Sequence, residues 1–132
     1  MNRKARILLI DDDIDFVDGM KVILGSKPYE VIVAHNGDEG INKARKENPD
    51  LILLDVIMPV KNGFMAAEQL KKDPQLKKIP VLMLTAFSSK GQQSSIPFSR
   101  GFDLETEDYL DKSIGPDELL ATVDKHLKKA GF

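Results

Sequence analysis

The apolar run from Leu51 to Leu54, which ends in Asp55, is the sequence feature that most constrains the fold. Four consecutive apolar residues are typical of a strand buried on both faces, as in a parallel sheet covered by helices on both sides. Pro59 and Gly63 follow shortly and predict a loop. Asp55 is therefore expected where a buried strand reaches solvent. Ligands bind at that edge of an open parallel sheet, although an aspartate there can equally end the strand and cap a turn.

Four more apolar runs alternate with segments of helical periodicity. Strands are predicted near residues 6–10, 29–34, 51–55, 80–85 and 108–110. Helices are predicted over residues 14–25, 38–48 and 63–72, over a short or frayed stretch within 89–99, and from about residue 115 onwards. Five strand–helix alternations with short links predict an α/β fold with a parallel sheet and helices on both faces. A chain of 132 residues corresponds to a single domain over residues 1–132, and no effector domain is expected.

Composition excludes several classes of function. The chain has no cysteine, so a disulfide framework and a thiolate zinc site are impossible. Its first apolar run spans only about six residues, which is too short for a signal-peptide core or a membrane span. The formal net charge is -2 with both signs spread along the chain, whereas nucleic-acid-binding domains usually have a basic face. We therefore expect a cytoplasmic protein that binds neither nucleic acid nor membrane.

Acidic and phosphate-binding side chains end the predicted strands. Asp11 and Asp12 follow the first strand, Asp55 ends the third, Thr85 ends the fourth and Lys112 follows the fifth. If the first and third strands are neighbours, three carboxylates share one corner of the sheet. Two like charges 4 Å apart repel by about 4 kcal/mol at an effective dielectric constant near 20, so such a corner requires a cation. Oxygen ligands at a wet strand edge suit Mg²⁺.

This set of groups suits phosphoryl chemistry. A divalent ion and the Lys112 ammonium would neutralise the oxygens of a phosphoryl group, and the Thr85 hydroxyl would donate a hydrogen bond to one of them. One carboxylate would attack phosphorus to form an aspartyl phosphate. Asp55 is the natural nucleophile, because it is the single carboxylate that faces the acidic pair.

Four motifs in this order resemble the receiver domain of two-component response regulators, the CheY-like family, from end to end. The motifs are the pair Asp11-Asp12, the run Asp55-x-x-Met58-Pro59-x-x-x-Gly63, the pair Thr85-Ala86, and Tyr109 three positions before Lys112. The resemblance implies a flavodoxin-like doubly wound sheet of five parallel strands in the order 2-1-3-4-5. It also implies a phosphorylation-dependent signalling switch, which catalyses only its own phosphorylation and dephosphorylation.

The resemblance also assigns roles to the metal-binding residues. Asp12 and Asp55 would be direct Mg²⁺ ligands, Asp11 would act largely through water, and the backbone carbonyl of Ile57 would be the third protein ligand. Asp55 would be the phosphoacceptor. Asp13 lies outside this set and is expected to cap the helix that follows it.

Other residues would complete the switch. Thr85 and Lys112 would hold the phosphoryl oxygens. Thr85 and Tyr109 would move with phosphorylation, although an aromatic residue on an edge strand can also serve packing alone. His35 and His126 have no neighbours in sequence that suggest catalysis, so both are expected at the surface.

The chain departs from the family pattern at two places. The family lysine is nearly always followed by proline, often through a cis bond, whereas Ser113 follows Lys112 here. We expect a trans bond, or a cis bond held by packing, because the cis form costs about 2.5–4 kcal/mol without proline. The segment between Thr85 and Lys112 is also long, with the extra residues near 97–107. Its phenylalanines, Phe87, Phe98 and Phe102, either pack the loop down or form an altered partner surface.

The sequence therefore favours a receiver that accepts a phosphoryl group from a histidine kinase or phosphotransfer protein. Its output partner would bind through the fourth helix, fifth strand and last helix. One alternative is a Mg²⁺-dependent Asp-x-Asp phosphohydrolase with Asp11 as nucleophile and Asp13 as acid. Another is a pseudo-receiver that binds partners without phosphorylation. A flavin carrier is disfavoured, because three aspartates after the first strand would repel the flavin phosphate.

Overall fold

The computed structural model describes residues 4–56, 63–85 and 108–131 of the chain, and all structural statements below refer to these residues. Its centre is a parallel sheet of five strands in the order β2-β1-β3-β4-β5. The strands are β1 (Ala5–Ile10), β2 (Tyr29–Ala34), β3 (Leu51–Asp55), β4 (Val81–Thr85) and β5 (Asp108–Asp111). Both the predicted strand order and the predicted strand positions are confirmed, to within one residue at each end.

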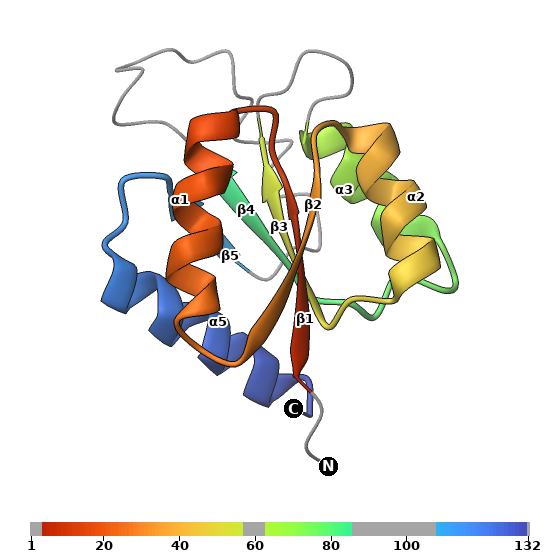
Figure 1. Cartoon of the computed structure of the whole chain (residues 1–132). Coiled ribbons are helices and arrows are strands. Elements are labelled where there is room, and N and C mark those ends of the chain that lie inside the picture. Colours follow the sequence, from red (N-terminus) through yellow and green to blue (C-terminus); the bar gives the residue numbers. More distant parts are fainter. Residues whose placement is uncertain (1–3, 57–62, 86–107, 132) are drawn as a thin grey trace.

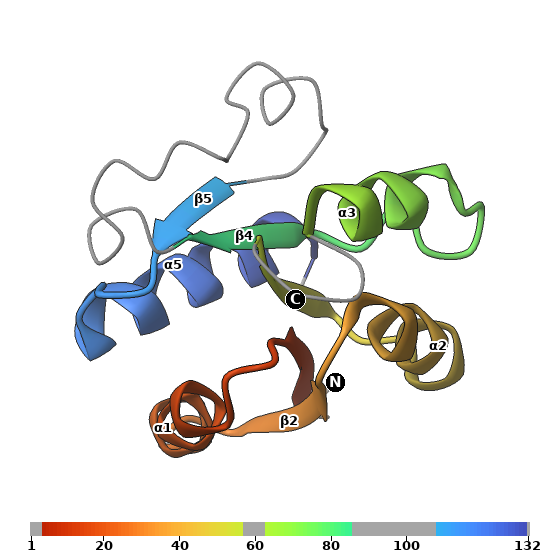
Figure 2. The same cartoon turned by 90° about the horizontal axis from the view of Figure 1, so that it is seen from above.

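Helices cover both faces of the sheet. They are α1 (Ile14–Gly25), α2 (Gly37–Glu47), α3 (Gly63–Lys72) and α5 (Pro116–Lys129). Helices α1 and α5 lie on one face, and α2 and α3 lie on the other (Figures 1 and 2). The helix predicted within residues 89–99 falls outside the described residues.

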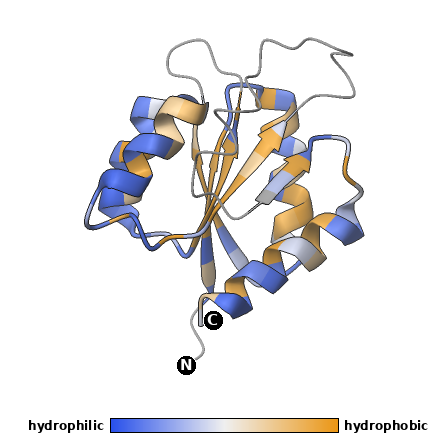
Figure 3. Ribbon diagram, turned by 180° about the vertical axis from the view of Figure 1, so that it is seen from behind, coloured by the Kyte–Doolittle hydropathy of each residue, from blue (hydrophilic) through white to orange (hydrophobic). Residues whose placement is uncertain are grey.

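The alternation of side chains along the strands explains this three-layer arrangement. In β3, Ile52 and Leu54 belong to the core under α2 and α3, whereas Leu51 and Leu53 belong to the core under α1 and α5. Successive residues of a strand point to opposite faces, so a strand must be apolar throughout if both faces are covered. Every residue of β3 and β4 is buried, and both strands are hydrophobic up to their last residues, Asp55 and Thr85. The strands at the centre of the molecule are accordingly mostly hydrophobic in colour (Figure 3).

Local capping fixes where two of the helices begin. The Asp13 carboxylate accepts a hydrogen bond from the Phe16 amide at 3.1 Å, which confirms the predicted cap of α1. Asn36 caps α2 by accepting from the Glu39 amide at 2.9 Å. Glu39 in turn accepts from the His35 amide, and this hydrogen bond is the main reason that the pKa of Glu39 lies below its usual value.

The two histidines differ in their environment. The His35 side chain is exposed, as predicted, but His126 is 3 % exposed and the prediction of a surface residue is wrong. His126 lies three residues after Val123 and next to Leu127 on α5, so helical periodicity carries it into the buried face. The expectation gave more weight to the polarity of histidine than to its position in the helix. None of the described helices is long and apolar enough to cross a membrane.

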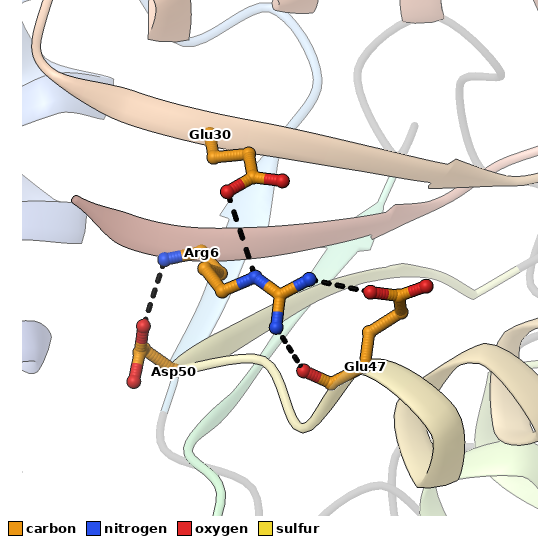
Figure 4. Close-up of polar contacts among 4 residues, drawn as sticks. All are labelled: Arg6, Glu30, Glu47 and Asp50. Atoms are coloured by element: carbon orange, nitrogen blue, oxygen red, sulfur yellow. Dashed lines mark hydrogen bonds and ion pairs between the residues drawn. The ribbon is translucent and has the colours of Figure 1, made fainter. Parts of the chain in front are cut away.

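A charged network fastens the amino-terminal end of the sheet, opposite the strand ends that carry the aspartates. The Arg6 guanidinium, on β1, donates to both the backbone carbonyl and the carboxylate of Glu47 at the end of α2 (Figure 4). It also lies 3.6 Å from a carboxylate oxygen of Glu30 on β2. The Arg6 amide donates to Asp50 at 2.7 Å, just before β3 begins. Arg6 thus joins β1 to β2, to the end of α2 and to the residue that precedes β3.

Replacing Arg6 with Met should lower the free energy of unfolding by about 1.5–3 kcal/mol, because two partly buried charge-assisted hydrogen bonds are lost. The matched control is Glu30→Gln, whose carboxylate is about half exposed and should contribute less than about 1 kcal/mol. Urea unfolding measures both values. Equal losses of unfolding free energy in the two variants would show that the contacts of Arg6 with Glu47 add no stability beyond that of an exposed ion pair.

Candidate functional site

Four strands deliver polar side chains to the carboxyl-terminal edge of the sheet. Asp11 follows β1, Asp55 ends β3, Thr85 ends β4 and Lys112 follows β5. These strands are consecutive neighbours in the sheet, so the condition on which the predicted acidic corner depends is met. Asp12 extends the set from the loop after β1.

The three aspartates form one cluster. One carboxylate oxygen from each of Asp11, Asp12 and Asp55 lies within 4.8 Å of the others. Asp11 and Asp55 are buried, whereas Asp12 is exposed. The cluster is therefore closed on the side of the sheet and open to water at its rim.

Backbone hydrogen bonds hold the buried aspartates in place. The Asp11 amide donates to Ala34 of β2 at 3.0 Å, and the Asp11 carboxylate accepts from the Asp13 amide at 2.9 Å. Beyond Asp55, the Val56 amide donates to Leu84 of β4 at 2.9 Å. Each aspartate thus sits where the ladder of the parallel sheet still fixes its backbone, and its carboxylate position follows from the sheet register.

Lys112 supplies the positive charge of the cluster. Its ammonium lies 2.8 Å from a carboxylate oxygen of Asp11 and 3.4 Å from one of Asp55. Burial by itself would lower the pKa of this ammonium. The close ion pair with Asp11 and the charge of Asp55 outweigh that effect, so the pKa of Lys112 lies above its usual value. The lysine is held charged between two buried carboxylates.

The donor set fits a divalent cation. With all four groups ionised, three carboxylates and one ammonium leave a net charge of -2. Mg²⁺ prefers oxygen ligands and retains several of its waters. Carboxylate oxygens that lie within 4.8 Å of one another are close enough to hold one such ion, either directly or through a bound water. Exposed Asp12 leaves room for the waters that Mg²⁺ retains.

Thr85 and Tyr109 occupy less decisive positions. The Thr85 hydroxyl is buried and donates to the Leu110 carbonyl of β5 through a long hydrogen bond of 3.4 Å. Binding a phosphoryl oxygen would require the hydroxyl to leave this weak partner. The Tyr109 ring is half-buried and packs against the core under α2 and α3. This packing accords with the simpler of the two expectations for Tyr109, and its role as a switch residue stays a prediction.

Some predicted residues fall outside the described part of the chain. Ile57, whose carbonyl is the expected third metal ligand, lies there with Met58, Pro59 and the three phenylalanines Phe87, Phe98 and Phe102. The Lys112–Ser113 peptide bond is described and is trans, which is the first of the two expected forms.

Gly63 supports the site for a steric reason that the motif alone does not reveal. A Cβ atom at this position would overlap the backbone carbonyl oxygen of Asp55 and would lie 2.6 Å from the Cα atom of Val56. The Gly63 amide donates to the Val56 carbonyl at 2.7 Å. Helix α3 therefore begins directly against the backbone of the aspartate, and only glycine leaves enough space.

Three further residues contact Lys112 or its turn and were not anticipated as site residues. The Phe16 ring centroid lies 4.6 Å from the Lys112 ammonium. The Asp111 carboxylate accepts hydrogen bonds from the amide and the hydroxyl of Ser113. The Asp-x-Ser spacing is a turn signal that could have indicated the second feature. No local signal relates Phe16 to a lysine that is 96 positions further along the chain (112 minus 16).

The fold and this acidic edge together define the chain as a signalling receiver domain. The chain belongs to the family described as the response regulator receiver domain, whose sequence profile matches residues 7–124. It is similar to protein PilH of Pseudomonas aeruginosa, with 36 % identity over 91 % of this chain and 95 % of PilH. A CheY-like receiver domain protein from Methanospirillum hungatei has the same fold, with a TM-score of 0.84, 28 % identity and 96 % coverage of both chains.

Other relatives are longer proteins. The chain is 40 % identical to RpaA of Synechocystis, which is described as a DNA-binding dual master transcriptional regulator, over 94 % of this chain and 49 % of RpaA. It likewise spans about half the length of several other curated transcriptional regulators that it matches. The chain shares with these relatives the receiver domain of two-component systems.

Gly63→Ala should lower the free energy of unfolding by about 1–3 kcal/mol, because the added methyl group must push the end of β3 away from α3. The matched control is Gly19→Ala on the exposed side of α1, where a Cβ would meet nothing within 4 Å. That change should raise the free energy of unfolding by about 0.5–1 kcal/mol through helix propensity. Urea unfolding measures both. Stabilisation by Gly63→Ala would contradict the close approach.

The raised pKa of Lys112 predicts a pH dependence of stability. A lysine whose pKa is higher in the folded state stabilises that state fully below its unfolded pKa of about 10.4, and the contribution disappears as pH rises through the folded value. Without Mg²⁺, the wild type should therefore lose more unfolding free energy than Lys112→Met between about pH 9 and 11. Urea unfolding across this range measures the difference, and parallel pH profiles would refute it.

Proposed function

We propose that this chain is a phosphorylation-dependent switch of a two-component system, which accepts a phosphoryl group on Asp55 from a kinase phosphohistidine. The observation that carries the proposal is the convergence of Asp11, Asp12 and Asp55 with the Lys112 ammonium at the edge where β1 and β3 end. Membership of the receiver family supports it. The donor would be a sensor histidine kinase or a phosphotransfer protein.

The contacts of Asp11 weigh against it as the acceptor. One of its carboxylate oxygens accepts from the Asp13 amide, and the other forms an ion pair with Lys112 at 2.8 Å. Nucleophilic attack by Asp11 would break this arrangement. Lys112 lies further from Asp55, at 3.4 Å, where it can follow a phosphoryl oxygen added to that carboxylate.

The same contacts weigh against an Asp-x-Asp phosphohydrolase. That mechanism needs Asp11 as nucleophile and Asp13 as a proton donor. The Asp13 carboxylate is exposed and accepts a hydrogen bond from the Phe16 amide at 3.1 Å as the cap of α1. This contact gives Asp13 a structural role at the start of the helix, and an acid role would require the carboxyl group to leave it.

In the proposed step, a carboxylate oxygen of Asp55 attacks phosphorus. The new O–P bond forms as the P–N bond to the donor imidazole breaks, and the imidazole nitrogen leaves with the electron pair and takes up a proton. Lys112 would pair with a phosphoryl oxygen, and the Thr85 hydroxyl would donate to another.

Asp12 and Asp55 would hold Mg²⁺ directly, with Asp11 acting largely through water and the Ile57 carbonyl completing the protein ligands. The ion would supply charge neutralisation of the phosphoryl oxygens when bound. Asp12 is the exposed member of the cluster and would keep its ligand side open to water.

Phosphorylation would act on partners by shifting a population between two states. Thr85 and Tyr109 would respond to the phosphoryl group. The output surface would involve β5, α5 and the helix predicted within residues 89–99. We propose residues 1–132 as a single receiver domain in the cytoplasm, where the absence of cysteine suits a reducing compartment. Neither nucleic acid nor membrane is proposed as a partner of this domain.

Incubation with Mg²⁺ and a small phosphodonor such as phosphoramidate should label the wild-type chain once. The label should disappear in Asp55→Asn, which lacks the nucleophile, but persist at reduced rate in Asp11→Asn. Intact-protein mass spectrometry measures the added mass. Loss of label in Asp11→Asn together with its retention in Asp55→Asn would overturn the proposal in favour of the phosphohydrolase. Absence of label in the wild type would favour the pseudo-receiver.

A further inference from the structure

Lys112 lies in a turn built differently from the lysine–proline pair of the family pattern, because Ser113 takes the place of proline. The Asp111 carboxylate oxygen Oδ1 accepts from the Ser113 amide at 2.9 Å and from the Ser113 hydroxyl at 2.8 Å. The Ile114 amide donates to the Asp111 carbonyl at 2.9 Å and closes the turn. A side chain that bonds to the backbone two residues ahead is an Asx turn, which restricts the backbone in place of a proline ring.

The same turn is attached to the functional edge of the sheet. The Lys112 amide donates to the Thr85 carbonyl at 2.7 Å, so the backbone of Lys112 is fixed to β4 on one side and by the Asp111 turn on the other. The Cα atom from which the lysine side chain departs is thereby held relative to Asp55, which pairs with Leu84 of β4 in the sheet.

The far end of the lysine side chain is held by an aromatic ring. Phe16, in the first turn of α1, lies with its ring centroid 4.6 Å from the ammonium, which is within the range of a cation–π interaction. The ring belongs to the α1 and α5 side of the core. It therefore forms a fixed apolar wall beside an ammonium that otherwise contacts Asp11 and Asp55.

We propose that Asp111 and Phe16 are positioning residues for Lys112, Asp111 by setting the turn through Ser113 and Phe16 by confining the ammonium. This inference rests on the proposed function, since it names the residues that aim Lys112 at a phosphoryl group on Asp55. Both would act through the lysine, Asp111 through the Ser113 turn and Phe16 through its ring beside the ammonium.

A positioning role has a signature that a general loss of structure lacks. Lys112 forms ion pairs with Asp11 and Asp55, two of the three carboxylates that would hold Mg²⁺. Loosening the lysine removes a competing cation and strengthens Mg²⁺ binding. It also slows phosphoryl acceptance at saturating Mg²⁺, because the ammonium is less often in place. A destabilised site would instead lose both properties together.

The test compares two pairs of variants. Asp111→Ala removes the turn acceptor, whereas Asp111→Asn removes the charge but keeps the Oδ1 acceptor. Phe16→Leu removes the ring and keeps apolar volume, whereas Phe16→Tyr keeps the ring. Lys112→Met, which removes the ammonium, gives the labelling rate and the Mg²⁺ affinity expected when the lysine contributes nothing. Calorimetric titration measures Mg²⁺ affinity of the unphosphorylated chain, phosphoramidate labelling at saturating Mg²⁺ measures the rate, and urea unfolding verifies that each variant is folded.

We expect Asp111→Ala and Phe16→Leu to label about 3- to 10-fold more slowly, comparable to the loss of one ordinary hydrogen bond, while binding Mg²⁺ about 2- to 5-fold more tightly. Asp111→Asn and Phe16→Tyr should stay within about 2-fold of the wild type in both measurements. Unchanged values in Asp111→Ala and Phe16→Leu, or a parallel loss of rate and Mg²⁺ affinity, would overturn the inference.

Failure of the proposed function gives a different result. If the wild-type chain takes no label, or if Asp55→Asn still takes it, the acceptor assignment fails. The Mg²⁺ affinities would then still report on the placement of Lys112. Tighter binding in Asp111→Ala but not in Asp111→Asn would support the Asx turn independently of phosphoryl transfer, and equal affinities would overturn it.

Discussion

The ion pairs of Lys112 with Asp11 and Asp55 are the interactions on which the functional edge depends. Two carboxylates are buried there, and a buried charge without a partner costs several kcal/mol. One ammonium offsets part of this charge and leaves the cluster acidic enough to attract a divalent cation. The lysine therefore neutralises part of the charge of the cluster and leaves the rest available to a metal ion, which the proposed phosphoryl transfer to Asp55 would use.

The strand order of the parallel sheet is what brings these charged groups together. Because β1 lies between β2 and β3, the residues that follow β1 and end β3 arrive side by side. Two-sided burial fixes the register, since a shift by one residue would exchange the two cores. At the opposite end, Arg6 joins the same strands and α2 through its contacts with Glu30, Glu47 and Asp50. The sheet therefore carries the Arg6 network at its amino-terminal end and the cluster of aspartates at its carboxyl-terminal edge.

The Lys112 turn lies close in sequence to α5, which is part of the surface proposed for output. Lys112 is followed after three residues by Pro116, where α5 begins, and its backbone is bonded to the end of β4. The turn of Asp111 and Ser113, which contains Lys112, therefore lies just before the beginning of α5 along the chain. The serine in place of proline makes this turn dependent on side-chain hydrogen bonds, which can be broken and formed again.

The sequence by itself determined the strands and their two-sided burial, because hydrophobic periodicity is a local property. The gathering of Asp11, Asp12 and Asp55 also required β1 and β3 to be neighbours, which the family resemblance implied and the sheet order shows. Only the tertiary structure decided the contacts of Arg6, the fit of Gly63 against Asp55 and the position of Phe16 beside the Lys112 ammonium. These depend on which elements meet across the fold and how closely. Periodicity indicates which face of an element is buried, but not which side chain from a distant part of the chain will lie against it.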